Sequence, residues 1–422
     1  MEQGLAAVPP RRLETRCCIA GGGPAGMMLG FLLARAGVPV LVLEKHRDFL
    51  RDFRGDTIHP STLQLMHELG LLEEFLKLPH QRAERLAAQI GDSELNIVDF
   101  RHLPTRCKYI ALMPQWDFLN FLAERARRLP AFRLELEAEA TGLIRDGEHV
   151  TGVQVRTPAG PLEVRADLVV ACDGRHSTLR REAGLEVMTL GAPMDVLWLR
   201  LSRRESDPAQ TMGRVEAGSM MVMLNRGDYW QCAYLIPKNG WQEVRDAGLE
   251  AFRGRIAALQ PWLGDRVAEL RDWDDVRLLT VAVDRLRHWQ LPGLLCIGDA
   301  AHAMSPIGGV GVNLAVQDAV AAANLLVQPL RRGAPDYDAL RAVQERREWP
   351  TRMTQGLQIA VQNNIIRRVL ASRERPTPPW PMRLVGRMPL LQRIPARLLG
   401  LGFRPEHIRT PAVAPNQTVR SG

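Results

Sequence analysis

The chain has 422 residues, which is long enough for two or three domains. Of these residues 46% are hydrophobic and 24% charged, a composition typical of a globular protein. No apolar run of about 18 residues predicts a transmembrane helix, and we expect no secretory signal at the N-terminus. The net charge of +8 belongs to the tail, because residues 367–422 carry eleven Arg and two Glu. The nearly neutral remainder argues against nucleic acid binding by the main fold.

The pattern of cysteines predicts the cellular compartment of the protein. None lies in a Cys-X-X-Cys pair, and several stand inside apolar, strand-like runs, as small buried hydrophobic residues do. They are Cys17, Cys18, Cys107, Cys172, Cys232 and Cys296. Free thiols persist in a reducing compartment, so we expect a cytoplasmic protein.

A glycine-rich loop near the N-terminus predicts a dinucleotide-binding unit. The apolar strand Arg16–Ala20 runs directly into GGGPAG, a helix follows, and a second apolar strand ends at Glu44. In such a unit Gly21 permits the tight turn, Gly23 lets a pyrophosphate approach the backbone, and Gly26 lets helix and strand pack closely. The Glu44 carboxylate can accept hydrogen bonds from both hydroxyls of an adenosine ribose.

Two further apolar strands end in polar residues. Leu168–Cys172 leads into Asp173, and Leu294–Ile297 leads into Asp299, a loop of small residues and a helix from Val312. A glycine loop at a helix N-terminus can hold a phosphate or a ring that becomes anionic, because the first helical N–H groups lack partners. Asp299 is suited to accept hydrogen bonds from a ribose or ribityl hydroxyl.

Residues 84–100 and 192–284 predict β structure between these motifs. The first range has the alternation of a hairpin, and the second contains several strands interrupted by one helix near residues 244–259. Trp198, Trp230 and several methionines would lie on the faces of this sheet. They would either line a pocket for an apolar substrate or form an ordinary core, and the pattern favours neither.

The C-terminal part predicts helices and a basic amphipathic tail. Residues 337–369 have helical spacing, and residues 380–403 interleave apolar side chains with pairs of arginines four positions apart. Pro389 and Pro395 divide the tail, so we expect two short helices. Such a segment can lie weakly on an anionic membrane surface, or its apolar face can pack back on the protein while the arginines face water.

Three separated motifs together resemble one known family. The motifs GGGPAG, ACDGRHSTLR and GDAAHAMSPIGGVGVN occur in an order similar to that of the single-component flavin monooxygenases of the p-hydroxybenzoate hydroxylase family, over residues 14–344. The resemblance implies an α/β fold: a Rossmann-like FAD-binding domain, an inserted β-rich substrate domain and a C-terminal helical appendage. The expected boundaries are 13–83, 108–186 and 286–335 for the FAD-binding segments, 84–107 and 187–285 for the substrate domain, and 336–422 for the C-terminal helices and tail.

The resemblance also implies site residues. Those expected to bind the cofactor are Gly21, Gly23, Gly26, Glu44, Lys45, Arg54, Gln115, Asp173, Gly174, Asp299, Gly311, Val312 and Asn313. Those expected to act in catalysis are Pro306 beside the flavin, His59 as a proton-accepting or relaying residue, and Arg54 near the cofactor phosphate and the entering nicotinamide nucleotide. His302 is expected to stabilise its loop, and no metal is expected.

The implied reaction is a hydroxylation. NAD(P)H would reduce non-covalently bound FAD, O2 would add at flavin C4a, and the hydroperoxide would deliver one oxygen atom to an apolar aromatic or polycyclic small molecule. The reduced flavin is anionic, and the N-terminus of the helix from Val312 would balance its charge. The choice between NADPH and NADH, and the oligomeric state, stay open.

Departures from the family pattern keep alternatives open. Ser305 precedes Pro306, where the family usually has two consecutive prolines, and the polar residues of benzoate-specific enzymes are not evident. A related halogenase would carry a WxWxIP motif, whereas Trp230–Pro237 has Cys232 and Tyr234 at the two tryptophan positions. A reductase or dehydrogenase acting on a similar substrate, and a flavin-binding regulator without turnover, are further alternatives.

Overall fold

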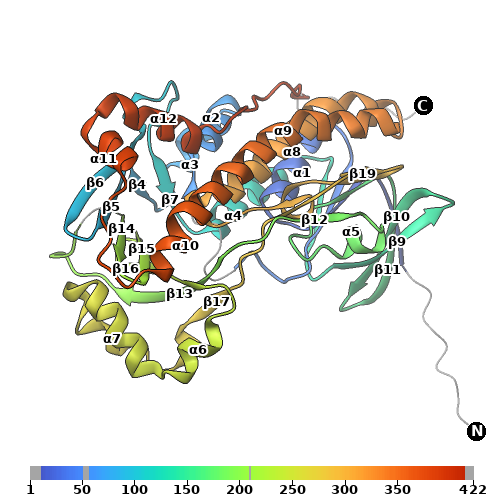
Figure 1. Ribbon diagram of the computed structural model, residues 1–422. Coiled ribbons are helices and arrows are strands. Elements are labelled where there is room, and N and C mark those ends of the chain that lie inside the picture. Colours follow the sequence, from blue (N-terminus) through green and yellow to red (C-terminus); the bar gives the residue numbers. More distant parts are fainter. Residues whose placement is uncertain (1–10, 51–56, 209–210, 414–422) are drawn as a thin grey trace, which may run out of the picture.

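The computed structural model describes residues 11–50, 57–208 and 211–413 (Figure 1). A mainly parallel sheet, named the parallel sheet, has the strand order β19-β20-β11-β1-β2-β8, and β10 and β9 extend it from β11. The strands are β1 (Arg11–Ala20), β2 (Val40–Leu43), β8 (Phe132–Glu135), β9 (Glu139–Asp146), β10 (His149–Thr157), β11 (Gly160–Ala171), β19 (Gln290–Leu291) and β20 (Leu294–Cys296).

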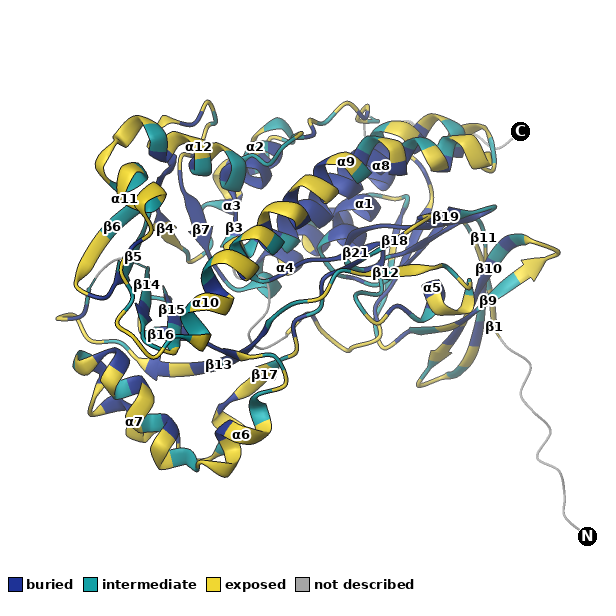
Figure 2. Ribbon diagram, viewed as in Figure 1, coloured by how far each residue is buried: buried dark blue, intermediate teal, exposed yellow. Residues whose placement is uncertain are grey.

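The centre of the parallel sheet is buried, which explains its apolar sequence. All four residues of β2 and the last four of β1 are buried, and β1 pairs in parallel with both β2 and β11. Three helices enclose the largest apolar core with this sheet (Figure 2). They are α1 (Pro24–Arg35), α4 (Gln115–Ala126) and α8 (Gly311–Arg332), and α1 packs against the other two.

One helical stretch, residues 307–332, is long and apolar enough to cross a membrane by length and composition. It contains α8, and 83% of its apolar window is buried inside the fold. Among the described residues this stretch therefore serves as a core helix, with α1 packed against it.

A seven-stranded sheet, named the middle sheet, has the order β17-β13-β16-β15-β14-β5-β6. Its strands are β5 (Arg85–Ile90), β6 (Ser93–Asp99), β13 (Met194–Ser202), β14 (Met212–Glu216), β15 (Ser219–Asn225), β16 (Tyr229–Pro237) and β17 (Arg277–Leu279). β5 and β6 form the predicted hairpin, and β5 joins the sheet by parallel pairing with β14.

Two helices, not one, cover the back of the middle sheet. They are α6 (Trp241–Asp246) and α7 (Leu249–Leu259), so the prediction of a single helix over 244–259 is wrong. Gly248 separates them because its φ of 89° lies in the left-handed region, which no helix interior adopts.

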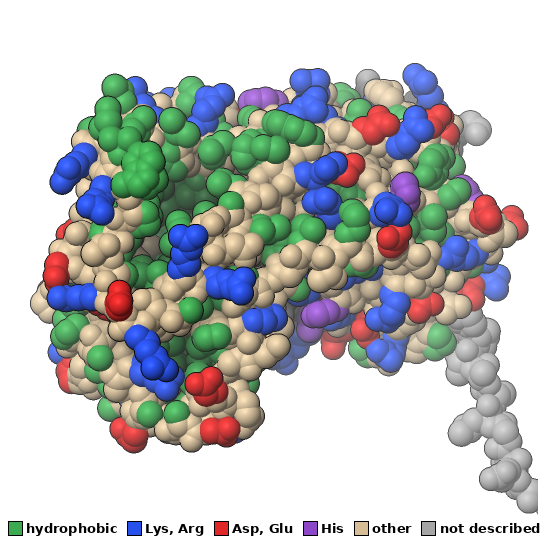
Figure 3. All heavy atoms as spheres, viewed as in Figure 1, with side chains coloured by type: hydrophobic (Ala, Val, Ile, Leu, Met, Phe, Trp, Pro, Cys, Tyr) green, Lys and Arg blue, Asp and Glu red, His purple; other side chains and the backbone are tan. Residues whose placement is uncertain are grey.

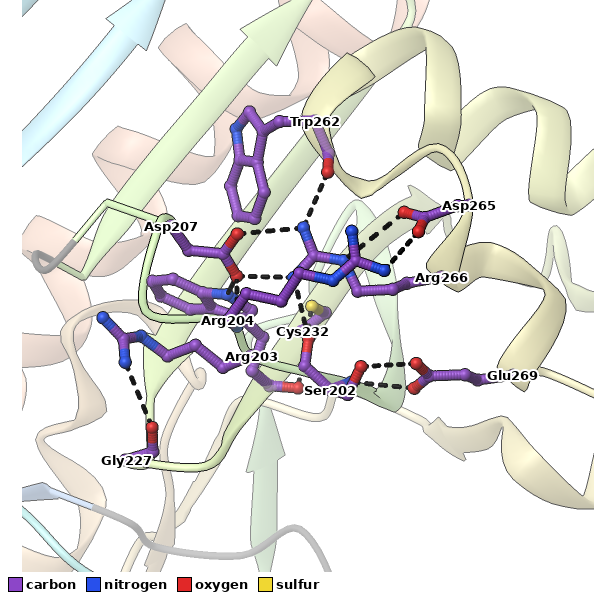
Figure 4. A network of polar contacts seen from close by, with 11 residues as sticks. Ser202, Arg203, Arg204, Asp207, Gly227, Cys232, Trp262, Asp265, Arg266 and Glu269 are labelled. Atoms are coloured by element: carbon purple, nitrogen blue, oxygen red, sulfur yellow. Dashed lines mark hydrogen bonds and ion pairs between the residues drawn. The ribbon is translucent and has the colours of Figure 1, made fainter.

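A buried polar network ties the back of the middle sheet to the segment after α7 (Figure 4). The Arg266 guanidinium donates to Asp207 Oδ1 at 3.0 Å and to the Trp262 carbonyl at 2.6 Å. Trp230 Nε1 donates to Asp207 Oδ2 at 2.8 Å, and the indole is fully buried among the apolar residues under α7. Trp230 is therefore a core residue, as one of the two interpretations of the sequence predicted.

The C-terminal part is helical, as predicted. A long rod crosses the molecule from the parallel sheet to the middle sheet, and two short helices then pack on β6 (Figure 1). The elements are α9 (Tyr337–Val361), the π-helix η7 (Gln362–Ile366), α10 (Arg367–Ala371), α11 (Trp380–Arg387) and α12 (Pro389–Gly400). The tail breaks at Met388, whereas Pro395 stands inside α12 and does not divide it.

Short elements connect the two large sheets. The small sheets β3-β7-β4 and β12-β18-β21 consist of β3 (Thr57–Ile58), β4 (Gln81–Ala83), β7 (Ile110–Leu112), β12 (Val187–Thr189), β18 (Asp284–Leu286) and β21 (His302–Ala303). The short helices are α2 (Pro60–Glu68), α3 (Leu72–Phe75) and α5 (Thr178–Glu182). The 3-10 turns are η1 (Phe100–His102), η2 (Pro261–Leu263), η3 (Arg266–Glu269), η4 (Trp273–Asp275), η5 (Gly298–Ala300) and η6 (Ile307–Gly309).

Candidate functional site

Four predicted site segments follow four adjacent parallel strands. The strands β20, β11, β1 and β2 are neighbours, and their last paired residues lie in register. The segments that follow them carry, in the same order, Asp299, Asp173, the glycine loop from Gly21, and Glu44. The carboxyl ends of parallel strands are where open α/β sheets bind ligands. The fold thus brings these residues to one edge of the parallel sheet.

The glycine loop leaves room for a phosphate at one position. A Cβ on Gly21, whose φ is 110°, would lie 2.3 Å from the Cys172 carbonyl oxygen, and a Cβ on Gly26 would lie 1.9 Å from the Gly21 carbonyl oxygen. A Cβ on Gly23 would meet nothing within 4 Å, and Gly23 stands before α1 without a side-chain cap. Open space in front of an uncapped helix N-terminus fits a pyrophosphate.

Glu44 is held beside the glycine loop. Its side chain is buried, with Oε2 accepting from the Gly22 N–H and Oε1 from the His46 N–H, both at 3.0 Å. These bonds fix the carboxylate at the end of β2, next to the loop. Lys45, the following residue, is exposed.

Asp173 has one carboxylate oxygen in use and one free among the described residues. Oδ2 accepts from the Leu179 N–H at 3.2 Å, whereas Oδ1 is buried without a hydrogen-bond partner in this part of the chain. A buried orphan acceptor fits a ligand that brings a donor, such as a hydroxyl. Gly174 has a φ of 86°, and Asp299 is half-buried in η5.

Arg180 joins these two loops, a role that the sequence pattern does not predict. Its guanidinium donates to the Ala300 carbonyl at 3.3 Å and to the Arg175 carbonyl, and lies 3.5 Å from the Asp284 carboxylate. It is buried, so these bonds fix the loop after β11 against the loop after β20. The only sequence signal was its position inside the ACDGRHSTLR motif.

The loop of small residues before α8 has little freedom. Pro306 precedes η6 and is half-buried, and Gly308 and Gly309 have φ values of 77° and 63°. The Thr57 hydroxyl donates to the Gly309 carbonyl at 2.9 Å, and a Cβ on Gly309 would lie 2.3 Å from that hydroxyl oxygen. No side chain caps α8, which begins at Gly311. Its N-terminus therefore offers partial positive charge to a ring edge.

Asn313 joins the start of α8 to the start of α2. Its Oδ1 accepts from the His59 N–H at 3.0 Å and from the Thr62 hydroxyl at 2.7 Å. The side chain is therefore engaged within the protein. The backbone of Asn313, with that of Val312, remains the part that can meet a ligand.

His59 is fully buried between α2 and α12. Its Nδ1 lies 2.7 Å from the Leu399 carbonyl oxygen, and Nε2 has no partner among the described residues. Burial lowers the pKa of His59 to about 4, although carbonyl contacts oppose that shift. The ring is therefore neutral near pH 7.

Gln115 lies on α4, a different element from the residues above. Gln115 is half-buried at the first position of α4, and among the described residues no hydrogen bond joins it to the other site residues. α4 follows β7 in the chain, and β7 pairs with β3 at Thr57. Arg54 lies outside the described residues.

The front of the middle sheet meets the small-residue loop. Along β13, β15 and β16 alternate side chains pack under α6 and α7, and the remaining ones form a second apolar cluster, named the front cluster. Its members are Met194, Val196, Ala233, Leu235, Val281 and Ile366, with Ala192, Trp198, Met220, Val222, Leu279, Ile307, Val361 and Leu370 packed against them. Ile307 directly follows Pro306, so the loop touches this surface.

A cavity of about 560 Å³ lies beside the front cluster. Its walls include the apolar Ala192, Ile359 and Leu370 and the polar Gln362 and Arg367. Its volume lies within the range of small-molecule sites.

A buried ionic network beneath the loop was not predicted. Asp318 Oδ2 accepts from the Gly298 N–H at 3.1 Å and lies 2.5 Å from His302 Nε2, and Asp318 Oδ1 accepts from Arg347 Nε at 2.9 Å. Arg347 also lies 3.4 Å from the Glu406 carboxylate. Asp318 thus contacts both His302 and the backbone at Gly298 and holds this loop in place. Because the partners come from distant segments, the sequence pattern contains no signal for the network.

These features fit a flavin dinucleotide-binding protein: one edge of the parallel sheet combines an open glycine loop with the carboxylates of Glu44 and Asp173, and α8 begins without a side-chain cap. The sequence profile described as FAD binding domain matches residues 14–356, and the chain belongs to that family.

Two relatives define the enzyme class. The chain is 35% identical over 355 residues to 6-methylpretetramide 4-monooxygenase of Streptomyces rimosus, which covers 83% of this chain and 84% of the relative. It is 30% identical over 323 residues to 12-dehydrotetracycline 5-monooxygenase/anhydrotetracycline 6-monooxygenase of Streptomyces rimosus subsp. rimosus, covering 72% of this chain and 60% of that relative. The protein is an FAD-dependent monooxygenase, a class that uses NAD(P)H and O2.

Solved structures confirm the predicted fold class. PqsL from Pseudomonas aeruginosa superimposes with a TM-score of 0.73 at 22% identity, covering 85% of this chain and 99% of PqsL. The p-nitrophenol 4-monooxygenase PnpA from Pseudomonas putida gives a TM-score of 0.73 at 21% identity, covering 93% of this chain and all of PnpA.

Proposed function

We propose that this monooxygenase hydroxylates a flat, mostly apolar polycyclic aromatic molecule held against the front cluster. The observation that supports this proposal is the position of the loop around Pro306. This loop follows the Asp299 segment at the edge of the parallel sheet, and its Ile307 packs against the front cluster, as Trp198 does. A planar substrate between loop and sheet buries its faces on apolar side chains. Two relatives are named for pretetramide and tetracycline compounds, which supports the polycyclic class.

The cofactor-binding residues at the edge of the parallel sheet form two groups. Glu44 binds the hydroxyls of the adenosine ribose, and the backbone at Gly23, with the N-terminus of α1, binds the pyrophosphate. Asp299 and the free Oδ1 of Asp173 accept hydrogen bonds from hydroxyls of the flavin chain. FAD, when bound, supplies the electron transfer and the oxygen chemistry.

The start of α8 and the small-residue loop serve the ring end of the site. The N–H groups of Gly311, Val312 and Asn313 stabilise negative charge on the ring edge, because no side chain competes for them. Pro306 and Ile307 exclude water from the space between loop and sheet. With a pKa of about 4, His59 is a weak proton acceptor at neutral pH, so its role is structural, through the contact with the Leu399 carbonyl.

Isotope labelling tests the proposal. Addition of a tetracyclic phenol to the holoenzyme should accelerate NAD(P)H oxidation, and product formed under 18O2 should carry one labelled oxygen atom. The control is the same mixture without substrate, which should consume NAD(P)H slowly. An unlabelled dehydrogenated or reduced product would contradict hydroxylation, and a halogenated product in the presence of halide would identify a halogenase.

We further propose a cytoplasmic enzyme whose tail makes weak contact with anionic membrane surfaces. All six cysteines are free, which suits a reducing compartment. Figure 3 shows apolar side chains gathered over α11 and α12, where Trp380, Leu390 and Ile394 are 73%, 65% and 59% exposed. The exposed arginines of these helices are Arg383, Arg387, Arg393 and Arg397. The opposite side of the tail packs on β6, so the contact is peripheral.

A further inference from the structure

The inward face of the rod formed by α9 and η7 is polar, the reverse of what a core-facing helix normally shows. Buried polar residues recur along it at helical spacing: Gln344, Arg347, Thr351, Gln355, Gln358 and Gln362. On the outward side Trp349, Met353 and Leu357 are 52%, 40% and 45% exposed. A buried amide is retained at low cost only where hydrogen bonds satisfy it, so the partners of these glutamines indicate what the face does.

Three of these glutamines bond the segment that carries Pro306. Gln358 Oε1 accepts from the Ser305 N–H at 3.2 Å, and Gln358 Nε2 donates to the carbonyls of Ser305 and Ile307, both at 2.9 Å. One side-chain amide therefore binds the backbone on both sides of Pro306. Because Gln358 is 4% exposed and Ser305 2% exposed, water does not compete for these bonds.

The neighbouring glutamines extend this arrangement. Gln362 Nε2 donates to the Ser305 hydroxyl at 2.7 Å, and that hydroxyl accepts from the Ile307 N–H at 3.3 Å. Gln355 Nε2 donates to the Ala303 carbonyl at 3.2 Å. Gln362 begins the π-helix, a feature that is often found at functional sites.

Ser305 supplies the N–H and the hydroxyl for part of this arrangement. A proline at this position, the usual family residue, has no N–H to donate to Gln358 and no hydroxyl for Gln362. In this chain hydrogen bonds from glutamine side chains therefore hold the loop at the position where the family usually has a second proline.

We propose that Gln358, supported by Gln355 and Gln362, is a positioning residue that fixes Pro306 against the flavin and so limits the loss of reducing equivalents as hydrogen peroxide. This inference rests on the proposed function, because it requires the loop to flank the flavin ring. Gln355 and Gln358 act through the backbone of residues 303–307, and Gln362 acts through the Ser305 hydroxyl.

The test compares Gln358→Met with Gln344→Met in the full-length protein. Gln344 is a matched control on the same helix: it is buried and its amide also bonds backbone, accepting from the Trp289 N–H at 3.0 Å and donating to the Arg287 carbonyl at 2.9 Å. Both variants should lose similar stability, because each leaves backbone groups unsatisfied.

Hydrogen exchange of the FAD-free proteins separates local from general effects. In Gln358→Met the peptide covering 303–309 should exchange on the order of tenfold faster, while in Gln344→Met the change should be confined to 287–289. Unchanged exchange at 303–309 in Gln358→Met would overturn the proposal. This arm needs no cofactor, so it is independent of the proposed function.

The loaded proteins supply the second readout. With FAD, substrate and NAD(P)H, Gln358→Met should alter the flavin absorption spectrum and release a larger fraction of reducing equivalents as hydrogen peroxide, whereas Gln344→Met should match wild type. If Gln358→Met does not fold, Ser305→Ala, which removes the hydroxyl that accepts from Gln362 and from the Ile307 N–H, should show the same changes to a smaller extent. Wild-type spectrum and peroxide yield in the folded Gln358 or Ser305 variant would also overturn the proposal. A wild-type chain that yields unlabelled product contradicts the proposed function instead, and leaves the exchange result standing.

Discussion

His59 makes the stability of this protein depend on pH. Burial lowers its pKa from 6.5 to about 4, so the unfolded chain binds a proton more readily than the folded chain between these values. The stabilisation is complete above pH 6.5 and is lost as the pH falls toward 4. From pH 7 to pH 5 this one residue should cost about 2 kcal/mol.

The measurement is urea unfolding of wild type and His59→Asn at both pH values. Asn does not titrate, can donate toward the Leu399 carbonyl and is favourable at the N-cap position that His59 occupies. The variant should therefore lose about 2 kcal/mol less than wild type on acidification. Equal losses in the two proteins would show that His59 is protonated as easily in the folded as in the unfolded chain.

At the scale of single elements, substitutions in the glycine loop between β1 and α1 should separate effects on FAD binding from effects on folding. Gly23→Ala adds a methyl group to open space, so the FAD-free protein should keep its melting temperature while FAD affinity falls by about tenfold or more, because the methyl occupies the space proposed for the pyrophosphate. In Gly26→Ala the methyl would lie 1.9 Å from a backbone oxygen. That clash should outweigh the helix propensity gain of ~1 kcal/mol and destabilise the fold by about 3 kcal/mol.

Calorimetry of the FAD-free variants and titration with FAD measure the two effects separately. Gly30→Ala is unsuitable as a control because its methyl would lie 2.7 Å from Val42. Gly254→Ala on α7 meets nothing within 4 Å, so it should leave FAD affinity unchanged and raise the melting temperature slightly through the helix propensity gain of ~1 kcal/mol. Unchanged FAD affinity in Gly23→Ala would place the pyrophosphate elsewhere.

At the scale of the whole molecule, the basic tail decides whether the enzyme reaches a membrane surface. Wild type should float with anionic liposomes at low salt, since each arginine near the surface contributes about 1 kcal/mol. Substituting Trp380, Leu390 and Ile394 by Ser should abolish flotation without unfolding, because all three side chains are mostly exposed.

Neutral liposomes and high salt serve as controls, and both should release the wild-type protein. Substitution is preferable to truncation at Arg375, because a shortened chain also loses Glu406, whose carboxylate bonds Arg346 at 2.7 Å and holds the C-terminal segment on α9. If wild type stays in the soluble fraction with anionic liposomes at low salt, the tail only packs on the protein.

The sequence by itself determined those structural features whose residues follow one another closely in the chain. The strand, glycine loop and helix from Arg16 were predictable because each step follows the last within a few residues. The same holds for the hairpin β5–β6 and the start of α8. The fold class is confirmed, while the domain boundaries and the cofactor roles of individual residues stay predictions, and Arg54 lies outside the described residues.

The tertiary structure decided where the chain departs from local preference. Pro395 stays helical inside α12, because the neighbouring Ala396 and the following Gly400 pack against the protein and outweigh the local cost of proline. The polar face of α9 would be solvent-exposed in an isolated helix. It is buried here because Ser305 and Ile307, some fifty residues earlier in the chain, supply backbone partners that no local pattern reveals.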